Sequence, residues 1–86
     1  IGLMKSLARE MGRSGITANT VSLGLVETGH DPAWLDANRE KLVKFYPTRR
    51  LGQAEDIAPT VVLLASPLSG WITGQVISVS GGYCMV

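Results

Sequence analysis

The chain has 86 residues, a length that allows one small domain. Hydrophobic residues make up 45% of it, which excludes a disordered tail, and the net charge of +1 excludes strong attraction to nucleic acid or an anionic membrane. The longest uninterrupted apolar run covers only residues 61–65, whereas a membrane span needs roughly 20. The single cysteine, Cys84, cannot form an internal disulfide, which indicates a reducing, cytoplasmic setting.

The first expected element is an amphipathic helix over residues 1–12. Its apolar side chains follow the spacing of one helix face: Leu3, Met4, Leu7, Ala8 and Met11. Residues 16–23 predict a strand, because they are rich in β-branched side chains and follow a glycine turn. Their apolar residues do not alternate strictly, which is typical of a strand buried on both faces of a parallel sheet. Gly24 ends this strand, and a loop over residues 24–29 follows.

A second helix is expected over residues 32–45, with Asp31 as its N-cap and Pro32 at its first position. Residues 54–66 predict a third helix, whose acidic side chains fall in the first turn, where the helix dipole favours negative charge. Residues 75–80 alternate in part and predict a second strand, which a pair of glycines ends.

The order helix, strand, helix, helix, strand indicates an α/β fold in which crossover helices join two parallel strands. Two such strands alone have exposed edges and faces. Parallel strands of this kind normally occur buried within larger doubly wound folds. The sequence therefore predicts one end of a larger parallel sheet.

Several stretches follow one another in the order and at the spacing of a known family. They are KSLARE at residues 5–10 with Gly15-Ile16, NTVSLGLVET at 19–28, RLGQAEDIA at 50–58, ITGQ at 72–75 and VSGG at 79–82. The second is similar to the family pattern N-x-V-x-P-G-x-x-x-T, and the third to R-x-G-x-P-E-E-I-A. Together they make the chain resemble the C-terminal third of a short-chain dehydrogenase/reductase, over essentially all of its 86 residues.

This resemblance implies that residues 1–86 are a partial NAD(P)-binding domain, the C-terminal portion of a Rossmann-type doubly wound parallel sheet. The implied parent is an oxidoreductase that transfers hydride between the nicotinamide of NAD or NADP and a small-molecule alcohol or ketone. In that parent the segment would supply a nicotinamide clamp, a substrate lid and, through residues 54–82, the interface of a homo-oligomer. The apolar content of residues 54–82 is equally compatible with burial in the domain core.

Several features of the family pattern differ here or are absent. Leu23, Ala54 and Ser80 stand where the pattern has proline, proline and aspartate. The glycine-rich phosphate-binding turn of the family is not found in the sequence. Neither tyrosine is followed by lysine four residues later, the pair that in the family exchanges a proton with the substrate oxygen. We expect that pair upstream of Ile1, and therefore no dehydrogenase activity from the 86 residues alone.

By resemblance, the cofactor-binding residues are Leu23, Gly24, Val26 and Thr28. The Thr28 hydroxyl and the backbone around Val26 would hydrogen-bond the nicotinamide carboxamide, and Gly24 would let the backbone approach the cofactor. The alternatives are a loop threonine and an ordinary turn glycine. Ligand sites in open α/β sheets lie at the carboxyl ends of the strands, which favours the functional interpretation of Thr28.

The substrate lid would carry His30, Trp34, Leu35 and Phe45, whose side chains would line an apolar pocket. An equally weighted alternative is that Trp34 and Leu35 simply pack their helix against the core. No metal site is expected, because His30 has no second histidine or cysteine at ligand spacing.

Two further alternatives concern charge and the chain as a whole. The Arg49–Arg50 doublet is interpreted as structural rather than phosphate-binding, because such pairs are more often solvated or salt-bridged. The alternative for the chain as a whole is a stand-alone, non-catalytic module that associates through its last helix and strand, or an inactive truncated product. A cooperative melt of the isolated chain would favour the stand-alone module. A molten or aggregated state would favour a fragment of a larger domain.

Overall fold

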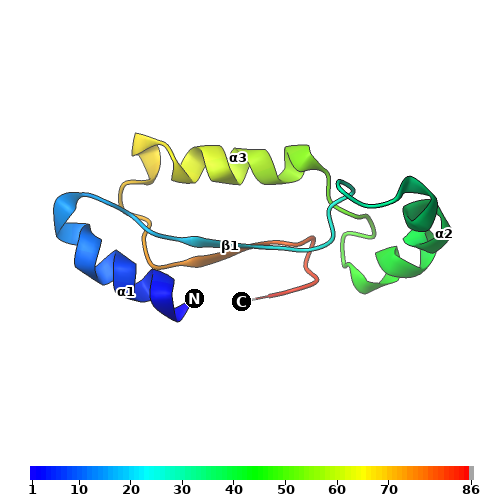
Figure 1. Ribbon diagram of the computed structural model, residues 1–86, viewed down its shortest axis with the longest axis horizontal. Coiled ribbons are helices and arrows are strands. Elements are labelled where there is room, and N and C mark those ends of the chain that lie inside the picture. The colour runs from blue at the N-terminus through cyan, green and yellow to red at the C-terminus, as the bar shows by residue number, and fades with distance from the viewer. Residues whose placement is uncertain (86) are drawn as a thin grey trace.

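The computed structural model describes residues 1–85 and contains three α-helices and two β-strands in the predicted order (Figure 1). The helices are α1 (Gly2–Met11), α2 (Pro32–Leu42) and α3 (Ala54–Leu64), and the strands are β1 (Thr20–Leu23) and β2 (Val76–Val79). Each α-helix is followed by a short 3-10 helix, at Gly12–Ser14, Val43–Phe45 and Pro67–Ser69. Val86 lies outside the described residues.

The two strands pair in parallel over their whole length, with Thr20 opposite Val76 and Leu23 opposite Val79. A parallel pair needs a long crossover connection, and α2 and α3 provide it here. In Figure 1, α3 runs along one side of the strands, α1 lies on the other side, and α2 lies beyond the carboxyl end of β1. The predicted α/β arrangement of two parallel strands with crossover helices is therefore confirmed.

β1 begins at Thr20, so the predicted strand over residues 16–23 was wrong in its first half. The Asn19 side chain explains the difference, because it replaces the backbone ladder at this point. Its amide nitrogen donates to the Ile72 carbonyl at 3.0 Å, and its amide oxygen accepts from the Gln75 N–H at 3.0 Å. The segment before Thr20 is thus held by the Asn19 side chain and by the Gly74 N–H, which donates to the Ala18 carbonyl at 2.8 Å, although its β-branched composition is typical of a strand.

The second helix begins as the sequence predicts. The Asp31 carboxylate accepts a backbone N–H at 3.1 Å as an N-cap, and Pro32 is the first helical residue. The α-helix ends at Leu42 rather than at residue 45, because residues 43–45 tighten into a 3-10 turn ahead of Pro47.

The buried core is small and lies beside the carboxyl ends of the strands. Its buried residues are Leu35, Tyr46 and Leu51, and the partly buried side chains of Leu25, Leu42 and Val43 pack against them. The core therefore joins α2, the segment before α3 and the loop that leaves β1. These are the segments in which the sequence predicts the functional site.

The molecule is elongated, and much of its apolar surface is exposed. The Cα radius of gyration is 15.6 Å, with extents of 49 × 21 × 21 Å, whereas a compact domain of this length has about 12 Å. Helices long and apolar enough to cross a membrane do not occur within the described residues. The large hydrophobic side chains that remain exposed are those of Ile1, Leu3, Met11, Ile16, Leu23, Trp34, Phe45, Val61, Val62, Leu63, Leu68, Trp71, Tyr83 and Met85.

Candidate functional site

The loop that leaves β1 changes its pairing partner within three residues. The Gly24 N–H still donates to the Val79 carbonyl of β2 at 3.3 Å. From Leu25 onward the chain pairs instead with Gly52, whose N–H donates to the Leu25 carbonyl at 3.0 Å and whose carbonyl accepts from the Glu27 N–H at 2.8 Å. The backbone of residues 25–27 is thus fixed against the segment that precedes α3.

Tyr46 hydrogen-bonds the loop at the residue where it changes its pairing partner. Its side chain is only 7% exposed, and its hydroxyl oxygen accepts the Leu25 N–H at 2.9 Å. A Cβ placed on Gly24 would lie 2.9 Å from the Tyr46 ring and 3.2 Å from the backbone of Ser80. Gly24 is therefore required by close packing within the protein itself. The sequence did not single out Tyr46 for this role, although an aromatic residue before a proline was a visible signal.

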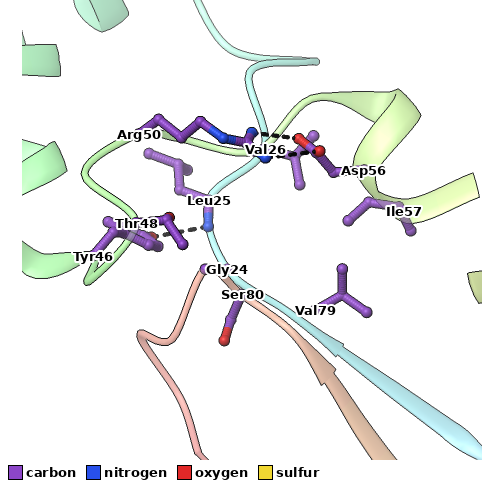
Figure 2. A pocket seen from close by; sticks show the side chains of 12 residues that line it. Gly24, Leu25, Val26, Tyr46, Thr48, Arg50, Asp56, Ile57, Val79 and Ser80 are labelled. Carbon is purple, nitrogen blue, oxygen red and sulfur yellow. Dashed lines mark hydrogen bonds and ion pairs between the residues drawn. The ribbon is translucent and has the colours of Figure 1, made fainter.

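A cavity of about 180 Å³ lies at this junction (Figure 2). Its walls come from the β1 loop, the stretch from Tyr46 to Gly52, the start of α3 and the end of β2. Of the predicted cofactor residues, Gly24 and Val26 line the cavity, while Leu23 and Thr28 do not. Leu23 is the last residue of β1, and the other three lie on the loop that follows it.

An ion pair closes one wall of the cavity. The Arg50 guanidinium donates to both carboxylate oxygens of Asp56, at 2.7 and 2.9 Å (Figure 2). The Gln53 N–H donates to the same carboxylate at 2.8 Å, which completes a capping box at the start of α3. The hydrogen bonds from Arg50 and, to a smaller extent, from the Gln53 N–H lower the pKa of Asp56 to about 2, from its usual 3.8. Arg50 is thus paired, as expected of a structural arginine.

Replacing Asp56 with asparagine is expected to lower the melting temperature by a few degrees at neutral pH, because the charge that pairs with Arg50 is lost. The pKa of Asp56 is lower in the folded protein than in the unfolded chain, so the stabilisation is present above about pH 4. It disappears as the pH falls through about 2. Thermal melts of both proteins between pH 2 and pH 7 should therefore converge at the acid end.

Glu55→Gln is the matched control, since Glu55 lies in the same helical turn and forms no ion pair within residues 1–85. Its melting curve should follow that of the wild type at each pH. A difference between wild type and Asp56→Asn that stays constant down to pH 2 would show that the charge of Asp56 is not what stabilises the helix.

Two polar groups of the loop have no hydrogen-bond partner among residues 1–85. Within residues 1–85, neither the Val26 N–H nor the Thr28 hydroxyl makes a hydrogen bond. The Thr28 N–H donates to the Val26 carbonyl at 2.8 Å, so a tight turn places these two residues close together. Thr28 is exposed and Val26 is half-buried. The loop therefore offers a backbone donor and a hydroxyl side by side.

Glu27 fixes the loop between these two groups. Its carboxylate accepts a hydrogen bond from Arg39 Nε of α2 at 2.7 Å and one from the Gln53 side chain, and it forms an ion pair with the Arg39 guanidinium at 2.6 Å. Its side chain is only 17% exposed. The sequence offered no sufficient signal for this role, because Glu27 and its partners are far apart in the chain.

The predicted lid residues lie on and around α2, outside the cavity. Leu35 is buried against Tyr46, as the packing alternative expects. Trp34 is 46% exposed and stacks on His30 with 6.0 Å between ring centroids, and Phe45 is 62% exposed. The part of the chain that the structure describes holds no group of three or more His, Cys, Asp or Glu side chains placed to bind a metal. The lid assignment stays a prediction.

A family model described as enoyl-(acyl carrier protein) reductase matches residues 1–84. The chain belongs to the short-chain dehydrogenase/reductase family. The 3-oxoacyl-(acyl-carrier-protein) reductase FabG of Vibrio harveyi is 44% identical over 86 residues, which are 100% of this chain and 35% of that protein. The acetoacetyl-CoA reductase of Synechocystis is 45% identical over 84 residues, 96% of this chain and 35% of that protein. This short-chain dehydrogenase/reductase sequence thus spans about 35% of the length of these relatives.

Solved structures confirm the partial Rossmann-like fold. YwfH, an NADPH-dependent reductase of bacilysin biosynthesis, matches with a TM-score of 0.89 and 26% identity, over 99% of this chain and 36% of that one. LugOII, a ketoreductase of lugdunomycin biosynthesis, matches with a TM-score of 0.89 and 30% identity, over 98% of this chain and 33% of that one. The short-chain dehydrogenase/reductase arrangement is therefore kept across the described residues.

Proposed function

We propose that the chain is the part of an NAD(P)-dependent oxidoreductase that clamps the nicotinamide and covers the substrate. The parent reaction is hydride transfer between the nicotinamide and the carbon of a small-molecule alcohol or ketone. The family match and the reductase names of the relatives support this reaction class. The single observation that supports the clamp is that the Val26 N–H and the Thr28 hydroxyl have no hydrogen-bond partner within residues 1–85.

These groups fit the nicotinamide carboxamide. A carboxamide presents one carbonyl acceptor and one NH₂ donor, and the loop presents one N–H donor and one hydroxyl that accepts or donates. Both groups follow the carboxyl end of β1, where ligands bind in open α/β sheets. When bound, the dinucleotide would supply or accept the hydride. In this proposal the Val26 N–H and the Thr28 hydroxyl orient the ring, and Leu23 and Gly24 place the backbone beneath it.

The lid assignment extends the same proposal. Trp34 and Phe45 present apolar surface on α2 and the turn after it, and His30 stacks on Trp34. In the proposed enzyme these side chains cover an alcohol or ketone substrate, while buried Leu35 anchors the lid to the core. No Tyr-x-x-x-Lys sequence occurs in residues 1–86, so we propose that these residues alone catalyse no hydride transfer.

Thr28→Val is expected to weaken binding of NADPH or NADH to the chain about fivefold, since it removes one hydrogen bond and keeps the side-chain shape. Binding is the appropriate measurement, because no turnover is expected from the chain alone. An NMR titration that follows the Val26 amide resonance with each dinucleotide reports both the affinity and the site. Thr28→Ser retains the hydroxyl and should bind as the wild type does. A Val26 resonance that stays unchanged with both dinucleotides would contradict the clamp.

We propose in addition that residues 54–82 form the interface of a homo-oligomer. Val61, Val62 and Leu63 of α3 are exposed, together with Leu68 and Trp71 beyond it. No Asp, Glu, Lys, Arg or His occurs after Asp56 in the sequence. Exposed apolar surface without charge favours association between copies of a protein.

Val62→Glu should therefore lower the mass of the particle measured by light scattering, because it places a charge in that surface. Leu3→Glu is the matched control, as Leu3 is 71% exposed on α1 and Val62 is 67% exposed on α3. Equal masses for the wild type and Val62→Glu would contradict the interface. A chain that associates but binds neither dinucleotide would favour the stand-alone, non-catalytic module.

A further inference from the structure

Glu27 occupies a position between the two proposed clamp groups, and it is held from both its backbone and its side chain. The Glu27 N–H donates to the Gly52 carbonyl at 2.8 Å. The side chain accepts from Arg39 and from Gln53. One residue thus joins the loop after β1, helix α2 and the residue that caps α3.

The bond to Arg39 is a specific link to α2. Within residues 1–85, it is the one ion pair that connects α2 with another segment, since Asp36, the other partner of Arg39, lies on the same helix. The remaining attachment of α2 to the core is apolar, through Leu35 and Leu42. A shift of α2 away from the loop would separate the guanidinium from a carboxylate that is only 17% exposed. That separation is costly, because a half-buried charge would lose its partner.

We propose that Glu27 is a positioning residue that couples α2 to the Val26–Thr28 loop. The inference rests on the proposed function, because it gives α2 the role of a lid over the clamp. When α2 is seated, the Glu27 carboxylate is pulled toward Arg39, and the flanking backbone is held in the geometry that exposes the Val26 N–H and the Thr28 hydroxyl. Coupling of this kind is reciprocal, so a ligand that orders the loop also orders α2.

Hydrogen–deuterium exchange of the chain, read in peptides that cover α2, tests this coupling. In Glu27→Gln without ligand, the α2 amides should exchange at least threefold faster than in the wild type, while peptides of β1 and β2 remain unchanged. Saturating NADPH or NADH should slow exchange in α2 of the wild type and should fail to do so in the variant. A merely local packing defect would not remove this ligand-dependent protection.

Two further variants make the result decisive. Arg39→Gln removes the same ion pair by changing its more exposed partner, and it should speed α2 exchange as Glu27→Gln does. The double variant should exchange no faster in α2 than either single variant. Asp36→Asn is the control, because it removes the other partner of Arg39 and leaves the loop untouched.

Unchanged α2 exchange in both Glu27→Gln and Arg39→Gln would overturn the coupling. If neither dinucleotide slows α2 exchange in the wild-type chain, that result would count against the proposed function. The exchange measured without ligand would still decide whether Glu27 holds α2, so the two failures are distinguishable.

Discussion

Replacing Tyr46 with alanine is expected to lower the free energy of unfolding by about 3–5 kcal/mol, the usual cost of removing a buried aromatic ring. The ring is one of three buried side chains in the core cluster and fills the space beside Gly24. Its hydroxyl also accepts the Leu25 N–H, which would lose that acceptor. Because small proteins have only about 5–15 kcal/mol of stability, urea unfolding followed by circular dichroism should show a large shift of the midpoint.

Two matched variants separate the ring from the hydroxyl. Tyr46→Phe keeps the ring and removes the acceptor of the Leu25 N–H, so a loss of about 1–3 kcal/mol is expected. Tyr83→Phe alters the tyrosine that stacks on Tyr46, with ring centroids 5.1 Å apart, and should have little effect, since Tyr83 is 59% exposed. A Tyr46→Ala protein as stable as Tyr83→Phe would contradict the central place of Tyr46 in the core.

Gly24→Ala is expected to lower the free energy of unfolding by about 1–3 kcal/mol, the usual cost of overpacking a filled site. Its new methyl group would lie 2.9 Å from the Tyr46 ring and 3.2 Å from the Ser80 backbone, so neither neighbour gives way freely. The loop must shift instead, which moves the Val26 N–H. We therefore expect a joint loss of stability, measured in urea, and of dinucleotide binding, measured by the NMR titration described for Thr28.

Gly12→Ala is the control for this substitution. A Cβ on Gly12 meets no atom within 4 Å, and its φ of −58° suits any residue. The change should be neutral or slightly stabilising, because alanine has less freedom in the unfolded chain. If Gly24→Ala behaved like Gly12→Ala in both measurements, the packing of Gly24 against Tyr46 would not be what fixes the loop.

The order and type of the elements were predictable from local signals. Asp31 and Pro32 start α2 by side-chain capping and a fixed φ, both of which depend on neighbours in the chain. The start of β1 was not predictable in this way. It depends on Asn19 bonding to Ile72 and Gln75, more than 50 residues further along. The amino-acid composition around Asn19 gives no sign of either of these hydrogen bonds.

For the candidate site, the sequence predicts a functional loop after β1, and within residues 1–85 the Val26 N–H and the Thr28 hydroxyl of that loop have no hydrogen-bond partner. The residues that hold the loop were not found, because their partners are distant in sequence. Glu27 meets Arg39 and Gln53, which lie 12 and 26 positions away. Glu27 lies between two residues predicted to bind the cofactor, and nothing in the neighbouring sequence indicates that its side chain fixes the loop.

The parallel register of β1 and β2 also has a consequence for the order in which the molecule forms. Thr20 pairs with Val76, so about 56 residues lie within one loop closed by this sheet, and they include every wall of the candidate site except the end of β2. Closing such a loop costs about 3–4 kcal/mol of chain entropy before any contact inside it is gained. Folding should therefore be slow for a chain this short. During synthesis, the bond from the Gly24 N–H to the Val79 carbonyl can form only after β2 has left the ribosome, whereas the bonds of the following residues to Tyr46 and Gly52 need no later part of the chain.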